Sequence, residues 1–461
     1  MHRSDFPKQN RPLTRREVIK GAGAGLLSLG LMGLNAPGTA RASQEQPNIV
    51  FILSDDHRWD VLSHLGHPIA ETPNMDRLAK EGVLFENAFC TTSLCSPSRA
   101  SFLTGNYAHH HGVRNNLTPW DNTNQTLFEP LHKAGYETAF IGKWHMPGKL
   151  PQLRGLDRFV TFDVDGGQGR FFNCPLVVDG QEVPSKKEYI TEELTDYSLD
   201  FIRQKREKPF CLYLSHKAVH YQFFPPKEME DLYEDVDLHL PREADNWVGV
   251  TDGQFYPQPL KKLYRDYLAC LKAMDMQIGR VLDELDRQGL ADNTIVVYAG
   301  DNGFFWGEHH LLDKRWPYEE SIRIPLLLRY PKRVKQTDQK IEQMVLNIDL
   351  TPTLLDLAGI RDVPAMDGES MAPYLQDPDK QGRRAWLYEY FADYPYWVPE
   401  TMGIRTDTHK YIEYEGRRSP ELFNLVDDPQ EKHNLYPGSI GQPLLTGLQA
   451  DLNSLKRGEH L

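Results

Sequence analysis

One cysteine in the chain opens a pattern that could perform chemistry. It is the first residue of Cys95-Ser96-Pro97-Ser98-Arg99-Ala100-Ser101-Phe102-Leu103-Thr104-Gly105. Ser96 suits a helix cap and Pro97 the first helical position, whereas Gly105 suits the helix end. We therefore expect Cys95 at the N-terminus of a short helix, where free backbone N–H groups and the helix dipole attract anions. Arg99 lies four residues further on and should project from the same helix face.

Three carboxylates and one amide form a second group. Asp55-Asp56 follow the apolar run 48–53, and Asp301-Asn302 follow the apolar run 294–298. Such a set offers only hard oxygen ligands, which suit Ca²⁺ or Mg²⁺ far better than zinc. Either pair alone could be a helix cap or a turn. Both pairs at predicted strand ends, in a chain that also carries Cys95, favour a metal site.

Lysine and histidine side chains form a third group. Its members are Lys143 and His145 after the predicted strand 137–141, His216 and His220 after the predicted strand 210–214, and Lys314. A lone histidine or lysine is often a solvated surface group, and for His216 that alternative stays open. His109, in a run of three histidines, follows the cysteine segment and could form part of a pocket wall.

The elements that must position these groups follow an α/β pattern. Short β-branched or apolar runs alternate with helical patterns, which predicts a mainly parallel sheet flanked by helices. Four predicted strands, 48–53, 137–141, 210–214 and 294–298, each end in one of the polar clusters. In open α/β sheets, ligands bind outside the carboxyl ends of the strands. The clusters should therefore meet at one sheet edge.

The chain divides into three predicted regions. Residues 43–375 carry the α/β pattern, and after about Leu375 short aromatic runs and turns predict a smaller α+β subdomain over 376–461. Residues 1–42 contain Arg15-Arg16, a glycine-rich apolar stretch and Ala40-Arg41-Ala42, which is typical of a twin-arginine signal cleaved after Ala42. We expect export by the twin-arginine translocase to the periplasm or beyond. The apolar stretch is shorter than the roughly 20 residues of a membrane span.

Composition excludes some classes of protein. The chain has 461 residues, of which 40% are hydrophobic, and a formal net charge of −13. A general nucleic-acid binder would need a broad positive surface, so we expect none. The five cysteines show no C-x-x-C spacing, and their odd number leaves at least one unpaired. Cys95 is the candidate for that role, and the other four could form disulfides in an oxidising compartment.

The segment around Cys95 resembles the signature of formylglycine-dependent sulfatases, which belong to the alkaline-phosphatase superfamily. Its full pattern, C-x-P-S-R-x-x-x-L-T-G, is far more specific than an isolated C-x-P, which would more often mark a buried structural cysteine. In this family a maturation enzyme oxidises the cysteine to formylglycine, whose hydrate attacks sulfur and later expels sulfate. The resemblance extends from Pro47 to the 421–431 segment. It implies an alkaline-phosphatase-like α/β fold with a mainly parallel or mixed central sheet.

The resemblance also implies roles for single residues. The residues Asp55, Asp56, Asp301 and Asn302, with the modified Cys95, would hold one divalent cation, usually calcium rather than magnesium. Arg99 and Lys143 would support the formylglycine, and Lys143 and Lys314 would hold sulfate oxygens. His145 would take a proton when sulfate leaves, and His220 would hydrogen-bond the leaving oxygen and could protonate it. His216 ranks second to His220, and His109 could contact substrate.

The segment 306–314 looks most like that of bacterial carbohydrate sulfatases, which implies a sulfated polysaccharide or oligosaccharide as substrate. The aromatic run 386–397 could stack on sugar rings, although such a run is more often a packed strand and turn. Aryl or choline sulfates remain alternatives. So do phosphonate or phosphodiester esters, because related hydrolases share the Cys-x-Pro-x-Arg element, and a non-catalytic carbohydrate-binding protein on the same scaffold.

Overall fold

The computed structural model describes residues 46–241, 250–251, 254–255, 258–438 and 441–459. The predicted signal segment 1–42 lies outside these residues. The chain from Gln46 onward forms one compact unit. The boundary that we place between residues 375 and 376 therefore stays a prediction.

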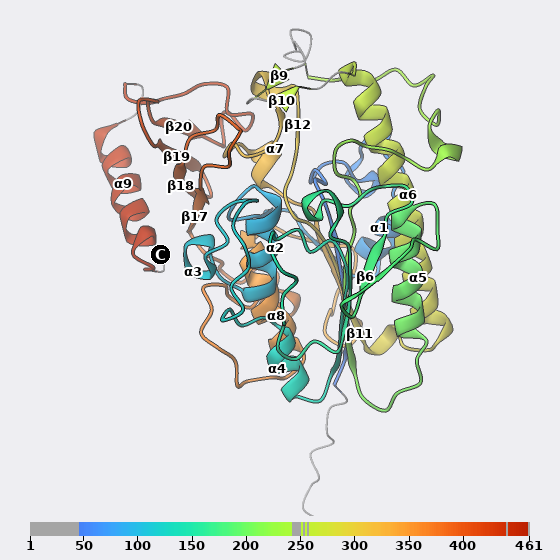
Figure 1. The fold of residues 1–461 in the computed structure, drawn as a ribbon. Coiled ribbons are helices and arrows are strands. Elements are labelled where there is room, and N and C mark those ends of the chain that lie inside the picture. The colour runs from blue at the N-terminus through green and yellow to red at the C-terminus, as the bar shows by residue number, and fades with distance from the viewer. Residues whose placement is uncertain (1–45, 242–249, 252–253, 256–257, 439–440, 460–461) are drawn as a thin grey trace, which may run out of the picture. The chain divides into compact units, whose positions relative to one another are not determined.

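A mixed ten-stranded sheet forms the centre of this unit, in the order β15-β2-β14-β11-β1-β8-β4-β5-β6-β7 (Figure 1). Its strands are β1 (Asn48–Ser54), β2 (Val83–Phe85), β4 (Glu137–Gly142), β5 (Arg158–Thr161), β6 (Leu176–Val178), β7 (Gln181–Val183), β8 (Phe210–Ser215), β11 (Thr294–Gly300), β14 (Leu326–Arg329) and β15 (Gln339–Ile341). The neighbours β11, β1, β8, β4 and β5 run parallel. In contrast, β14 and β6 run antiparallel to β11 and β5. The predicted mixed sheet is confirmed.

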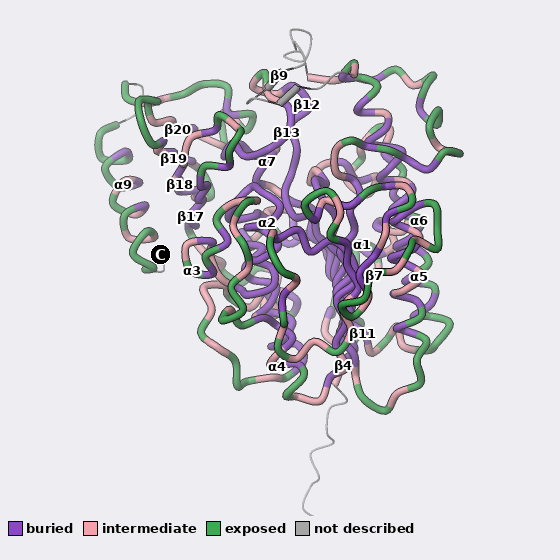
Figure 2. The backbone as a smooth tube through the Cα atoms, in the orientation of Figure 1, coloured by how far each residue is buried: buried purple, intermediate pink, exposed green. Residues whose placement is uncertain are grey.

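Helices cover both faces of this sheet (Figure 1). On one face lie α1 (Pro73–Lys80), α5 (Ile190–Ile202) and α6 (Leu260–Arg287); on the other lie α2 (Cys95–Thr104), α4 (Phe128–Lys133) and α8 (Leu350–Leu357). Because successive side chains of a strand point to opposite faces, β1 contributes to both cores. Val50 and Ile52 join the first core, and Ile49 and Phe51 join the second. Burial on both faces explains why β1 is apolar almost throughout. Figure 2 shows the sheet buried between helices whose outer faces are exposed.

The C-terminal part is a smaller α+β subdomain, as predicted. An antiparallel sheet runs in the order β17 (Ala385–Tyr390), β18 (Thr401–Thr406), β19 (His409–Tyr414) and β20 (Glu421–Asn424), and α9 (Gln442–Lys456) packs against it. Three aromatics of β17, Trp386, Tyr388 and Tyr390, are buried against the main unit. Tyr394 and Trp397 beyond the strand are 81% and 75% exposed. The first half of the aromatic run thus serves the core.

A buried charge cluster joins this subdomain to the loop that carries Lys314. The ammonium of Lys410, in β19, lies 2.9 Å from Glu319 and 2.7 Å from Glu431. It also donates a hydrogen bond of 2.9 Å to the carbonyl oxygen of Pro317. Glu319 begins the short helix α7 (Glu319–Ile322). The subdomain therefore fixes the backbone three residues after Lys314.

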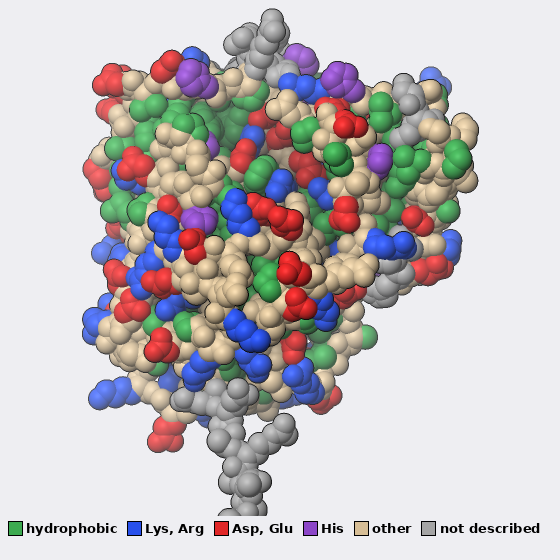
Figure 3. All heavy atoms as spheres, turned by 180° about the vertical axis from the view of Figure 1, so that it is seen from behind, with side chains coloured by type: hydrophobic (Ala, Val, Ile, Leu, Met, Phe, Trp, Pro, Cys, Tyr) green, Lys and Arg blue, Asp and Glu red, His purple; other side chains and the backbone are tan. Residues whose placement is uncertain are grey.

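The surface charges and the state of the cysteines can also be described. On the face shown in Figure 3, basic and acidic side chains are interspersed. All five cysteines lie in the described residues, and each is free and buried. In the described part of the chain, no helix combines the length and the apolar character that a membrane crossing requires.

Candidate active site

Four adjacent parallel strands deliver the predicted site residues to one edge of the sheet. In the order β11, β1, β8 and β4, these strands end next to one another, because Ser54 pairs with Gly300 and Leu53 pairs with Ser215. Asp301-Asn302, Asp55-Asp56, the segment 216–220 and the segment 143–145 follow these ends. This is the edge at which open α/β sheets bind ligands.

A glycine allows β4 to end very close to β8. Gly142 has a φ of 122°, and a Cβ atom at this position would lie 1.8 Å from the carbonyl oxygen of Ser215. No other residue fits there without displacement of the backbone. The close approach lets the backbone N–H of Lys143 donate to the same Ser215 oxygen at 2.7 Å. Lys143 is thereby directed towards the end of β1.

The cysteine helix begins two residues earlier than the capping pattern predicts. Cys95 is the first residue of α2, and Leu94, rather than Ser96, occupies the cap position without a side-chain capping bond. The helix ends as predicted, because Gly105 adopts a left-handed φ of 72°. Ser96 instead donates its hydroxyl to the carbonyl oxygen of His145. The start of α2 is thus fixed by the active-site loop after β4.

The Cys95 thiol is fully buried at the centre of the cluster. Its Sγ accepts a hydrogen bond from the Lys314 ammonium at 3.2 Å and donates one to Asp55 Oδ1 at 3.5 Å. Burial, reinforced by the negative charge of Asp55, raises the pKa of this thiol well above its ordinary value. An unmodified Cys95 would therefore stay protonated, unlike the low-pKa thiols that act as nucleophiles.

Arg99 holds three strand ends together. Its guanidinium bonds Asp301 Oδ2 at 3.0 and 2.9 Å, and donates to Ser215 Oγ at 2.6 Å and to the carbonyl oxygen of Lys143 at 3.1 Å. The side chain is only 2% exposed. Arg99 thus bonds groups at the ends of β11, β8 and β4 and fixes their relative positions.

The acidic side chains are arranged as a divalent cation requires. One carboxylate oxygen from each of Asp55, Asp56 and Asp301 lies within 4.8 Å of the others, and all three residues are buried. Asp56 Oδ2 and Asn302 Oδ1 are enclosed, yet no group in the described residues donates a hydrogen bond to either. Buried acceptors are rarely left unpaired. Oxygen donors alone fit calcium or magnesium, and these residues fit such an ion.

The electrostatics of the carboxylates agree with this arrangement. Burial raises the pKa of Asp301 to about 7, and the neighbouring Asp55 charge adds to the effect. Burial also raises the pKa of Asp56. For Asp55 burial also raises the pKa, but the neighbouring cations, Lys143 first and then Arg99 and Lys314 among others, together outweigh it and hold the pKa well below the usual range. The neighbouring cations thus favour the ionised form of Asp55 but do not fully offset the burial of Asp56 and Asp301.

The remaining catalytic candidates surround the same carboxylates. Lys143 binds the Asp55 carboxylate and Gln168 Oε1, the latter at 2.7 Å. Lys314 binds the Asp56 carboxylate, and His220 Nε2 lies 3.8 Å from Asp56 Oδ2. His145 Nδ1 lies 3.5 Å from Ser96 Oγ. The structure thus brings together every residue predicted for catalysis or metal binding: Cys95, Arg99, Lys143, His145, His220, Lys314, Asp55, Asp56, Asp301 and Asn302.

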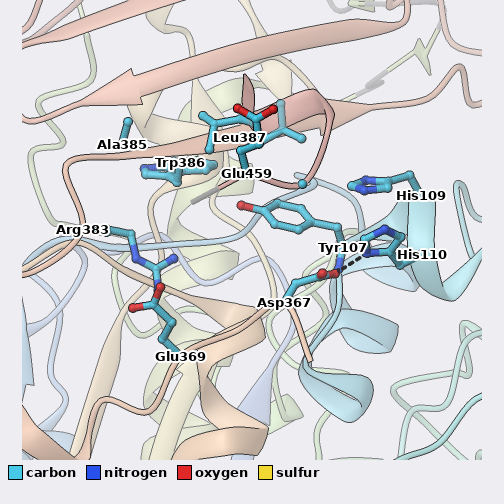
Figure 4. Close-up of a pocket in the computed structure, with 12 residues that line it drawn as sticks. Tyr107, His109, His110, Asp367, Glu369, Arg383, Ala385, Trp386, Leu387 and Glu459 are labelled. Carbon is cyan, nitrogen blue, oxygen red and sulfur yellow. Dashed lines mark hydrogen bonds and ion pairs between the residues drawn. The ribbon is translucent and has the colours of Figure 1, made fainter. Parts of the chain in front are cut away.

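Among the described residues, the side chains of the two further histidines bond to none of these ten. His216 is fully buried, neither ring nitrogen has a hydrogen-bond partner among the described residues, and burial lowers its pKa to about 3. His109 lines a separate pocket with Tyr107, His110 and Asp367, shown in Figure 4. There its Nδ1 is paired with Glu389 at 2.6 Å. None of the ten clustered residues lines that pocket, and substrate contact by His109 or His216 stays a prediction.

Three supporting side chains were not singled out from the sequence. Ser215 accepts from Arg99 and donates to the Lys143 carbonyl at 2.8 Å, and Gln168 binds Lys143. Asn347 donates to Ser98 Oγ at 3.0 Å and so supports α2. Ser215 could have been found, because it directly follows the predicted strand 210–214. Gln168 and Asn347 carry no local signal.

A cavity of about 600 Å³ opens beside the cluster. It is lined by Asp165, Gln168, the segment 169–172, Lys217, His220, Tyr221, Gln222 and Phe224. Because His220 also lies near Asp56 and Gln168 binds Lys143, the cavity adjoins the catalytic cluster. It is large enough for a sugar residue.

Comparison with known proteins identifies the family. Residues 47–360 match the family model described as sulfatase. The chain belongs to the sulfatase family. Residues 307–458 of this sulfatase also match the model described as the C-terminal region of N-sulphoglucosamine sulphohydrolase. The protein is therefore a sulfuric ester hydrolase.

Individual relatives agree with this assignment. The sulfatase is 32% identical to the N-acetylglucosamine-6-O-sulfatase of Bacteroides thetaiotaomicron over 489 aligned positions, which cover 89% of this chain and 87% of the relative. A protein solved in complex with its substrate D-glucosamine-2-N,6-O-disulfate matches with a TM-score of 0.84 and 29% identity, over 90% of this chain and 98% of the other. The phosphonate monoester hydrolase of Agrobacterium radiobacter matches with a TM-score of 0.75 and 23% identity, over 89% and 96%. The alkaline-phosphatase-like fold is confirmed.

Proposed function

We propose that this sulfatase removes sulfate from a sulfated carbohydrate, a polysaccharide or its oligosaccharides, with formylglycine derived from Cys95 and one bound calcium ion. The observation that carries the proposal is the position of Cys95, between the Lys314 ammonium and Asp55, in a cluster where the carboxylate oxygen Asp56 Oδ2 and the amide oxygen Asn302 Oδ1 accept no hydrogen bond from the described residues. The sugar class is supported by the two relatives that act on or bind glucosamine sulfates.

The cation would be held by Asp55, Asp56, Asp301 and Asn302, next to the side chain of residue 95. When bound, it would polarise a sulfate oxygen and lower the pKa of an attacking hydroxyl. Calcium suits the set better than magnesium, because magnesium retains several waters and demands a stricter octahedron. The three carboxylates are balanced by the three cations Arg99, Lys143 and Lys314. A divalent ion would therefore leave the site net positive and suited to an anionic ester.

Formylglycine at position 95, once hydrated, would supply the hydroxyl that attacks sulfur. Lys314, 3.2 Å from Cys95 Sγ, is placed to neutralise sulfate oxygens at the reacting centre, and Lys143 borders the same carboxylates. Arg99 keeps Asp301 and the strand ends in register. These fixed charges would stabilise the transition state without reorganisation.

The two histidines would handle protons. His220 Nδ1 contacts the carbonyl oxygen of Tyr221, so this nitrogen carries the hydrogen and Nε2 is the atom that faces the site. Nε2 carries a proton only in the imidazolium form, which burial and the charge of Lys143 disfavour by lowering the pKa of His220 well below its usual value. In that form His220 would transfer the Nε2 proton to the leaving sugar oxygen and return to the neutral ring. Burial and the charge of Lys143 lower the pKa of His145 well below its usual value. His145 is thus neutral and able to accept a proton when sulfate is released.

The proposal includes maturation and export. A formylglycine-generating maturation enzyme would act on Cys95, and the twin-arginine segment 1–42 supports export by that translocase to the periplasm or beyond. Residues 43–375 would form the catalytic domain and residues 376–461 the C-terminal subdomain.

The test is sulfate release, measured by ion chromatography, from a panel of sulfated glycosaminoglycan and algal oligosaccharides. The enzyme is co-produced with a formylglycine-generating enzyme, and Cys95→Ala is the control. Release from one sugar class by the wild type alone supports the proposal. If mass spectrometry shows converted Cys95 but no sugar is desulfated, the carbohydrate proposal fails. Aryl sulfates, choline sulfate and phosphonate esters then become the candidates.

A further inference from the structure

The cavity beside His220 contains a buried lysine that forms no ion pair within the described residues. Four lysines are buried among the described residues: Lys143, Lys217, Lys314 and Lys410. Lys143, Lys314 and Lys410 each lie against at least one carboxylate. Lys217 is 4% exposed, and no carboxylate in the described chain lies within ion-pair distance of it. Its recorded partner is the ring of Phe171, 4.9 Å from the ammonium.

The position of Lys217 requires an explanation, because burial of an unpaired ammonium is costly in free energy. A cation–π contact recovers only part of that cost. Lys217 lines the cavity, so its charge can be met by a ligand that enters there. The unmet positive charge indicates an anionic group as that ligand.

The backbone around Lys217 is rigidly held. His216 donates its N–H to the Leu53 carbonyl oxygen at 2.8 Å, and Val219 donates to the Asp55 carbonyl oxygen at 2.8 Å. In return, Asp55 donates its N–H to the Ala218 carbonyl oxygen at 2.9 Å. The segment that carries Lys217 is thus bonded directly to the backbone of a metal-site residue. A group bound by Lys217 would have a fixed position relative to the reacting centre.

The other cavity residues define the kind of ligand. Arg170 and Asp165 form a two-bond ion pair at 2.9 and 3.2 Å, so their charges cancel. Lys217 therefore supplies the net positive charge. Phe171 and Phe224 contact one another at the wall, and Phe224 is 40% exposed. An apolar wall beside a single cation suits a sugar ring that carries an anionic substituent.

We propose that Lys217 binds a second anionic group, a sulfate or a carboxylate, on the sugar residue that carries the scissile sulfate or on its neighbour. This inference rests on the proposed function and extends it. His220, which serves the leaving oxygen, and Lys217 line the same cavity, so one saccharide can contact both. The sulfatase is then selective for saccharides that are anionic at two positions, and Lys217 is a specificity residue.

The experiment compares substrates that differ only in the second anion. Kinetics are measured with N-acetylglucosamine-6-O-sulfate, with D-glucosamine-2-N,6-O-disulfate, and with a disaccharide in which a uronic acid is linked to 6-O-sulfated N-acetylglucosamine. The enzymes are the wild type, Lys217→Met, Lys217→Arg, and the control Lys133→Met, whose lysine is exposed on α4. Thermal unfolding confirms that each variant is folded. Lys217→Met removes an unpaired buried charge, so it should be at least as stable as the wild type.

We expect Lys217→Met to lower kcat/KM for at least one of the two dianionic substrates about ten-fold or more, mainly through KM, with less than about a two-fold change for the monosulfated sugar. Lys217→Arg should retain most of the preference, and Lys133→Met all of it. Loss with the disulfate alone identifies a sulfate subsite, and loss with the uronide alone identifies a carboxylate subsite. Equal effects of Lys217→Met on all three substrates would overturn the inference.

A second measurement separates this inference from the proposed function. The three saccharides are titrated by calorimetry into the Cys95→Ala enzyme, with and without Lys217→Met. If the mature wild type desulfates none of them, the proposed function fails for these sugars, but the titration still decides the role of Lys217. Tighter binding of a dianionic saccharide that disappears with Lys217→Met supports the subsite. Equal affinities for mono- and dianionic saccharides overturn it.

Discussion

The Lys314 ammonium lies 3.2 Å from Cys95 Sγ, although 219 positions separate the two residues in the chain. Lys314 arrives from the loop between β13 (Leu312–Asp313) and α7, and Cys95 from the start of α2. The same ammonium binds the Asp56 carboxylate. One lysine therefore bridges the predicted nucleophile and the predicted metal ligands, which is the arrangement that a sulfate ester bound across both would need.

The first prediction concerns Cys95. Cys95→Ala should abolish sulfate release, because the precursor of the nucleophile is absent, yet stability should fall by only about 1 kcal/mol, since a single sulfur atom is removed from a packed site. Ion chromatography measures the release, and calorimetry measures the unfolding temperature. Turnover by this variant at the wild-type rate would refute the mechanism.

The second prediction concerns the metal. Removal of calcium with a chelator should abolish activity and lower the unfolding temperature, because an ion at a hundred times its Kd stabilises the native state by about 2.7 kcal/mol. Asp301→Asn keeps the shape of the side chain and should bind less calcium, as measured by elemental analysis. Added calcium should restore the chelated wild type but not the variant. Full activity of a metal-free Asp301→Asn preparation would argue against a metal-dependent reaction.

Much of this site could be predicted because its residues follow recognisable strands. The runs before Asp55 and Asp301 are apolar throughout, as strands buried on both faces must be, and their ends therefore marked the ligand edge. Lys217 and Gln168 could not be predicted in the same way. A lysine or glutamine in a loop has no periodic pattern, and only the tertiary contacts show which one enters the site.

The start of α2 shows a different limit. Ser96 and Pro97 form a good capping pattern, yet the helix begins at Cys95. The Ser96 hydroxyl is already engaged by the carbonyl oxygen of His145, from a loop that sequence spacing could not place beside it. A tertiary hydrogen bond has replaced the local one, at the position where chemistry is expected.

The third prediction concerns the close approach of β4 and β8. Gly142→Ala should displace Lys143 and destabilise the fold by about 2 kcal/mol or more, because a methyl group would collide with the Ser215 carbonyl oxygen. Gly135→Ala is the matched control. Gly135 also has a positive φ, of 95°, but no atom lies within 4 Å of the added Cβ, so only the conformational cost of about 1 kcal/mol applies. Equal unfolding temperatures for the two variants would contradict the packing argument.

The fourth prediction concerns the buried charge cluster of the C-terminal subdomain. Lys410→Met should destabilise the protein by about 3–5 kcal/mol, because buried Glu431 would lose its ammonium partner and Glu319 would keep only Arg405, at 3.4 Å. Activity should also fall, since Lys410 holds the backbone near Lys314 through Pro317. The control is Lys456→Met, which removes an ion pair with Glu413 whose lysine is 31% exposed and should cost no more than about 1 kcal/mol. Denaturant unfolding measures both, and a small effect at Lys410 would mean that the cluster rearranges.

The fifth prediction concerns pH. Burial, with the nearby charge of Lys143, lowers the pKa of Lys217 to about 8. Below that pH the ammonium is charged and binds the second anion of a substrate, and as the pH rises through about 8 the charge is lost. The value of kcat/KM reports ionisation in the free enzyme. The ratio of kcat/KM for the dianionic substrate that depends on Lys217 over that for N-acetylglucosamine-6-O-sulfate should therefore fall up to about ten-fold between about pH 7 and 9.

The catalytic groups do not affect this ratio of kcat/KM values, because both substrates depend equally on the ionisation of the nucleophile and the histidines. A change in the ratio therefore reports on the group that binds the second anion. Lys217→Arg carries a guanidinium that stays charged throughout this range, so its ratio should be constant. A wild-type ratio that falls while the arginine variant's stays flat assigns the titration to residue 217. The same decline in both enzymes would place it on another group and remove this support for the anion subsite.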